Sequence, residues 1–97
     1  MQISVRFFTI LREIVGKKEE ILRFSRNQKV TVNSVLEKLS EQYGKAFTEY
    51  IYDSKNGELK GFLQLLVNGR SLSKTEGLNS ELSDGDIIAI LPPVSGG

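Results

Sequence analysis

The sequence predicts a two-layer α+β domain, in which one main helix covers one face of a β-sheet. Two observations lead to this fold class. Residues 31–44 have the apolar spacing of an amphipathic helix, and four or five short segments around them read as strands. At 97 residues the chain is long enough to bury one modest core. These patterns alone leave a split βαβ sandwich open as a competing arrangement.

The first elements expected are two strands that form a hairpin. Residues 2–8 alternate between apolar and polar side chains, which is typical of a half-buried strand. Its buried face would carry Ile3, Val5 and Phe7. A short apolar turn over residues 10–15 ends at Gly16, which can take the left-handed conformation that closes such a segment. Residues 20–24 alternate again and predict the second strand.

The clearest element is the helix of TVNSVLEKLSEQYG. Thr31 is a suitable N-cap, because its hydroxyl can accept a hydrogen bond from a backbone N–H that lacks a helical partner. Gly44 is placed to end the helix. The apolar residues fall on one face: Val32, Val35, Leu36, Leu39 and Tyr43.

The segment from 45 to 61 is too apolar for a disordered linker, and the turn-forming stretch DSKNG lies inside it. We therefore expect a packed excursion with a hairpin-like tip. A strand over residues 62–67 follows, then a tight turn at Asn68–Gly69 and a short return strand over residues 70–72. Two further leucines, Leu78 and Leu82, lie in an expected loop or short helical turn.

The last strand expected spans residues 87–91. It follows a turn of sequence DGD and is a continuous apolar run, which is compatible with a central strand covered on both faces. Beyond it the chain reads PPVSGG.

Composition excludes several classes of function. The formal net charge is +1 and the basic residues are scattered, so no interface for nucleic acid or an acidic membrane surface is expected. No apolar run approaches the roughly 20 residues that span a bilayer. The first residues lack the features of a signal peptide. The absence of cysteine fits a cytoplasmic protein.

The residue inventory also limits the chemistry. Without cysteine or histidine there is no thiolate nucleophile, no imidazole base and no zinc site of the usual kind. The glycine spacings do not form a phosphate-binding P-loop. We therefore expect that no side chain of this protein is the reacting group, and that the chain itself binds no metal and no cofactor.

Three stretches resemble the ubiquitin-like sulfur-carrier family: FFTILREIVG, LLVNGRSL and LSDGDIIAILPPVSGG. The nearest member type is the small subunit of molybdopterin synthase, and archaeal ubiquitin-like small modifier proteins are similar. The terminal Gly-Gly after PPVS is the most specific match. The resemblance implies a β-grasp fold over residues 1–91, with a mixed sheet of four to five strands and neighbouring first and last strands. It implies an extended tail over residues 92–97.

The resemblance also implies a function. An E1-like enzyme would use ATP to adenylate Gly97, and a sulfur donor would convert the adenylate to a thiocarboxylate. The sulfur would pass to a pterin precursor held by the molybdopterin synthase large subunit, in a heterotetramer whose catalytic side chains belong to that larger partner. The excursion over residues 45–61 is similar to that of the archaeal members. Conjugation to lysines of target proteins therefore stays open, as does an interaction module with an inert tail.

The tail residues suit this role. Gly96 and Gly97 lack a Cβ and can enter a narrow channel. Pro92 and Pro93 fix φ and favour an extended exit from the last strand. Six extended residues reach about 20 Å at about 3.3–3.6 Å each. The tail residues expected to contact a partner are Pro92, Pro93, Val94 and Ser95.

A docking surface is expected on the body of the domain. If Ile88 and Ile90 point inward, an apolar patch is left facing outward, made of Phe8, Ile87, Ala89 and Leu91. The sequence is equally compatible with burial of these residues under the excursion over residues 45–61.

Four charged residues are further candidates for contact with a partner. Asp84 and Asp86 are expected first as turn formers and then as contacts for the activating enzyme. Arg12 and Arg70 are the basic candidates.

Overall fold

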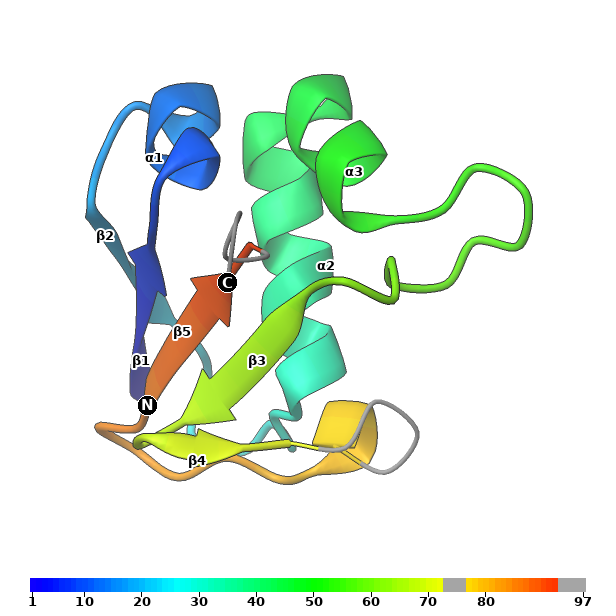
Figure 1. Ribbon diagram of the computed structural model, residues 1–97. Coiled ribbons are helices and arrows are strands. Elements are labelled where there is room, and N and C mark those ends of the chain that lie inside the picture. Colours follow the sequence, from blue (N-terminus) through cyan, green and yellow to red (C-terminus); the bar gives the residue numbers. More distant parts are fainter. Residues whose placement is uncertain (73–76, 93–97) are drawn as a thin grey trace.

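The computed structural model describes residues 1–72 and 77–92. Within these ranges five strands form one sheet in the order β2-β1-β5-β3-β4 (Figure 1). The strands are β1 (Gln2–Phe7), β2 (Glu19–Arg23), β3 (Gln64–Val67), β4 (Arg70–Ser71) and β5 (Ile87–Leu91). The first and last strands run parallel, and every other neighbouring pair is antiparallel. The sheet is therefore mixed, with β5 at its centre.

Helices lie against this sheet (Figure 1). The long helix α2 (Val32–Tyr43) crosses one face, and α1 (Ile10–Val15) and α3 (Lys45–Ile51) lie near its carboxyl end. A short 3₁₀ turn, η1 (Gly77–Asn79), precedes β5. This is the predicted β-grasp fold. No helix in the described part of the chain has the length and apolar character needed to cross a membrane.

The core lies between α2 and the inner face of the sheet. In β1 the alternate residues Ile3, Val5 and Phe7 have no exposed surface, as the alternation predicted. In β5 the buried residues are Ile88 and Ile90, and the alternate residues Ile87, Ala89 and Leu91 are only partly buried. The prediction that this strand is covered on both faces is therefore wrong. An apolar run indicates a central strand, but it does not show how many layers of helix lie over the sheet.

The helix α2 begins and ends as predicted. The Thr31 hydroxyl oxygen accepts a hydrogen bond from the Ser34 N–H at 3.2 Å, and the Ser34 hydroxyl oxygen accepts one from the Thr31 N–H at 3.1 Å. This reciprocal capping satisfies two donors at the start of the helix. Gly44 ends it with a φ of 73°, a region that favours glycine.

The excursion contains a helix that the sequence did not predict. Gly44 is both the end of α2 and the start of α3, so the two helices follow each other without a linker. Phe47 and Ile51, one helical turn apart, are fully buried. The hairpin-like tip is present, because Tyr52 and Leu59 form an isolated antiparallel bridge.

The second half of the sheet follows the prediction with shorter strands. The expected strand over 62–67 begins only at Gln64, since the N–H of Leu63 bonds back to the Lys60 carbonyl in a turn. Asn68 and Gly69 both have positive φ, 50° and 84°, as a tight hairpin turn requires.

Candidate functional site

The outer face of the central strands carries apolar side chains. Since Ile88 and Ile90 are fully buried, the alternate residues of β5 point away from α2. Leu66 of β3 lies opposite Ala89, so it belongs to the same face. We define the outer apolar surface by its five partly buried residues: Phe8, Leu66, Ile87, Ala89 and Leu91.

The helix of the excursion does not account for the partial burial of this surface. Its helix α3 packs against α2 and α1, which lie on the other side of the sheet (Figure 1). Leu66 was absent from the predicted patch. The sequence signal for its outward orientation was its position next to Leu65, which is buried. Only the pairing of Leu66 with Ala89 shows which residues surround it.

The chain leaves the sheet at the end of its central strand. Leu91 closes β5 opposite Gln64, and Pro92, half-buried, is the last described residue. Five tail residues with predicted roles lie outside the described residues: Pro93, Val94, Ser95, Gly96 and Gly97. The domain thus carries the start of the tail at the middle of the sheet, next to the outer apolar surface.

The two arginine candidates lie on different elements, one on a helix and one on a strand. On α1, the Arg12 Nε donates a hydrogen bond of 2.9 Å to the Phe7 carbonyl, and its guanidinium carbon is 5.4 Å from the Phe8 ring centroid. Arg12 is therefore adjacent to the outer apolar surface. Arg70 lies on β4, at the sheet edge, on an exposed position.

The two aspartates lie at the other end of β5. One Asp84 carboxylate oxygen accepts a hydrogen bond from the Gln2 N–H at 2.6 Å. Asp86 accepts bonds from the Ser83 N–H at 2.8 Å and from the Asn68 side-chain amide at 3.0 Å. Both carboxylates therefore hold turns together before β5 begins, and the structure does not bring them near Leu91.

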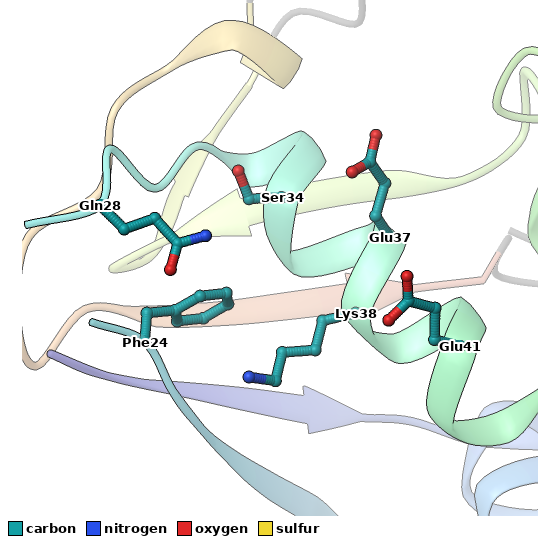
Figure 2. Close-up of a pocket in the computed structure, with 6 residues that line it drawn as sticks. All are labelled: Phe24, Gln28, Ser34, Glu37, Lys38 and Glu41. Carbon is teal, nitrogen blue, oxygen red and sulfur yellow. The ribbon is translucent and has the colours of Figure 1, made fainter.

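A separate hollow of about 270 Å³ lies between the end of β2 and α2 (Figure 2). Its lining residues are Phe24, Gln28, Ser34, Glu37, Lys38 and Glu41. Figure 2 shows Lys38 extending towards Phe24, and its ammonium lies 4.6 Å from that ring centroid and donates to the Arg23 carbonyl at 2.8 Å. This lining is too polar for the apolar pocket of a small-molecule site.

The described side chains form no catalytic constellation. Within residues 1–72 and 77–92 there is no group of three His, Cys, Asp or Glu residues that could hold a metal ion. What the arrangement can do chemically is to present the main chain beyond Leu91 beside a surface suited to another protein.

Comparison with known proteins agrees with this geometry. Residues 5–97 match the ThiS family. Small archaeal modifier protein 3 of Haloferax volcanii is 36% identical over 97 residues, which cover all of both chains. The crystal structure of SAMP1 from the same organism covers both chains completely, with a TM-score of 0.83 and 26% identity. A chain of the crystal structure of the Amycolatopsis orientalis BexX/CysO complex gives a TM-score of 0.75 at 26% identity, with 98% of this chain and 99% of that chain covered.

Proposed function

The chain belongs to the ThiS family of ubiquitin-like sulfur carriers, and from this premise we propose that its reacting atom is the carbonyl carbon of Gly97. A free α-carboxyl group has a pKa of roughly 3.3–3.7, so it is ionised at neutral pH and resists nucleophiles. It must be activated before sulfur or an amine can attack it. The activating groups and the bound ATP therefore belong to a partner, an E1-like adenylating enzyme.

The proposed reaction has two steps before sulfur is transferred to an acceptor. A carboxylate oxygen of Gly97 attacks the α-phosphorus of ATP, pyrophosphate leaves, and an acyl-adenylate forms. A hydrosulfide donor then attacks the carbonyl carbon, the bond to AMP breaks, and a thiocarboxylate remains after loss of a proton. The sulfur is carried on the main chain, which is consistent with a protein that has no cysteine.

For the acceptor we propose the small-subunit role in molybdopterin synthase. The thiocarboxylate would donate its sulfur to a pterin precursor in the large subunit, within a heterotetramer in the cytoplasm. The observation that carries the proposal is the position of β5. It lies between β1, which pairs with it as far as Ile90, and β3, which pairs with it as far as Leu91, and the chain after it leaves beside the outer apolar surface.

Conjugation to proteins is the second candidate. It is favoured by the likeness to a protein named small archaeal modifier protein 3, which extends over the whole of both chains. Here the same adenylate would be attacked by a lysine amine of a target protein, with release of AMP and formation of an isopeptide bond.

Two measurements separate these functions. The first is co-purification of a molybdopterin synthase large subunit with the tagged chain, which the leading proposal expects. The second is peptide mapping of cell extract for Gly-Gly remnants on lysine, which the second candidate expects. Failure of the chain to stimulate pyrophosphate release from ATP by any adenylating enzyme of its own cell would count against both.

A further inference from the structure

A shallow hollow of about 340 Å³ opens beside α1, where β1 and β2 meet. Three cations and one carboxylate line it together with Phe7 and Phe8: Arg6, Arg12, Lys18 and Glu19. The carboxylate of Glu19 is already paired, because its Oε2 lies 3.4 Å from the Arg6 Nε. Among the described residues no carboxylate lies within ion-pair distance of Arg12 or Lys18. The hollow thus concentrates positive charge in a chain whose formal net charge is only +1.

Of the two cations without a carboxylate partner, Arg12 is held in place. The 2.9 Å hydrogen bond from the Arg12 Nε to the Phe7 carbonyl fixes the guanidinium, and the Phe8 ring lies 5.4 Å from its central carbon. An arginine held at Nε and against a ring has lost much of its side-chain freedom before any ligand arrives. Less entropy is then lost when its terminal nitrogens bind a planar anion.

The hollow adjoins the start of the tail. Phe7 lies opposite Ile90 in the parallel register of β1 and β5, one residue before β5 ends. Phe8 lines the hollow and also belongs to the outer apolar surface. A protein that receives the chain beyond Leu91 and covers Phe8 therefore reaches Arg12 as well.

We propose that this hollow binds a carboxylate side chain of the activating enzyme, at the rim of the surface that covers the base of the tail. The inference rests on the proposed function, since it names a contact of the same partner. Positive charge selects an anion, and the planar guanidinium matches a carboxylate with two parallel hydrogen bonds. A charge pair at the rim of an interface mainly raises the association rate and fixes the register of the partners.

The test compares two lysines in the activation reaction. Lys18→Glu reverses the charge in the hollow, whereas Lys29→Glu makes the same change in the exposed loop before α2, at the other end of the molecule (Figure 1). Neither lysine has a side-chain hydrogen bond among the described residues, so both variants should fold. We expect Lys18→Glu to raise the KM of the enzyme for the carrier about tenfold with kcat within about twofold, and Lys29→Glu to change neither beyond about twofold.

Arg12→Lys provides the second arm, because it keeps the charge and removes the planar fork. For Arg12→Lys we expect a rise in KM that lies between those of Lys29→Glu and Lys18→Glu. For Lys18→Glu we also expect KM to depend less on salt concentration than it does for the wild-type chain. If the wild-type chain is activated but Lys18→Glu and Lys29→Glu have equal KM values, or neither changes KM, the inference is overturned. A wild-type chain that is never adenylated would instead overturn the proposed function itself.

Discussion

Tyr43, at the end of α2, donates a hydrogen bond of 2.5 Å from its hydroxyl to the Glu20 carboxylate of β2. The same carboxylate oxygen accepts bonds from the Gln42 amide and from the Lys17 ammonium. Burial raises the pKa of Glu20, but these three hydrogen bonds outweigh it and hold that pKa below its ordinary value of 4.5. Burial and the neighbouring carboxylate both raise the pKa of Tyr43. One ionised side chain thus joins the edge strand of the sheet to the helix that covers it.

Tyr43→Phe should lower the free energy of unfolding by about 1–2 kcal/mol, because it removes one hydrogen bond to a charged group while two others remain. Urea denaturation at neutral pH measures the change. Tyr50→Phe is the matched control, since the Tyr50 ring contacts Phe62 and the substitution leaves that contact intact. A loss as large for Tyr50→Phe would show that the Glu20 contact is not the cause.

The stability of the domain should depend on the charge of Glu20. Since the folded-state pKa lies below the unfolded one, the contribution is complete above about pH 4.5 and is lost as pH falls through the folded value. The difference in unfolding free energy between the wild type and Glu20→Gln should therefore be largest near neutral pH and shrink in acid. Glu49→Gln, in an exposed ion pair with Lys45, should show little difference at any pH. A wild-type minus Glu20→Gln difference that stays constant from pH 7 to acid would contradict the account.

The turn before β4 should depend on Asn68 in two separable ways. Its φ is 50°, and its side chain accepts from the Ile87 N–H at 2.9 Å and donates to Asp86 at 3.0 Å. Asn68→Gly keeps the backbone conformation and loses the two side-chain bonds, at a cost of about 2 kcal/mol. Asn68→Ala loses the same bonds and also places a residue with a Cβ at positive φ, so it should cost about 1 kcal/mol more than Asn68→Gly. Thermal unfolding that ranks alanine as the milder substitution would be inconsistent with this.

The outer apolar surface should matter for activation rather than for folding. Leu91→Ala should raise the KM of the activating enzyme for the carrier about tenfold, as expected for an anchor residue at the centre of an interface. Ile21→Ala is the control: Ile21 is 44% exposed on the edge strand β2, outside the defined surface. Steady-state kinetics with both variants tests the idea, and equal KM values for the two would contradict it.

Local patterns predicted the elements that local forces determine. The helix α2 follows from the spacing of its apolar residues and from Thr31 and Gly44 at its ends, and the hairpin turn follows from Asn68–Gly69. The helix α3 was missed, because its seven residues make fewer than two full turns. Its two buried residues, Phe47 and Ile51, are too few to show a helical repeat in the sequence.

The site depends more on contacts between distant segments. Which residues surround Ala89 is decided by the pairing of β5 with β1 and β3, so Leu66 could not be assigned from its own neighbours in sequence. The same holds for the arginines. Arg12 and Arg70 looked alike as candidates, and only the fold places Arg12 against Phe8 and Arg70 on the far edge strand.

The central claim is that the main-chain carbonyl of Gly97 is the reacting group. Intact-mass spectrometry tests it directly, after incubation of the chain with its adenylating enzyme, ATP and a sulfide donor. We predict exchange of one oxygen for sulfur in the wild-type chain, located at Gly97 by fragmentation, and no exchange in a variant that carries one additional, uncleaved residue after Gly97. Exchange in that variant, or none in the wild type while a known carrier reacts in parallel, would contradict the claim.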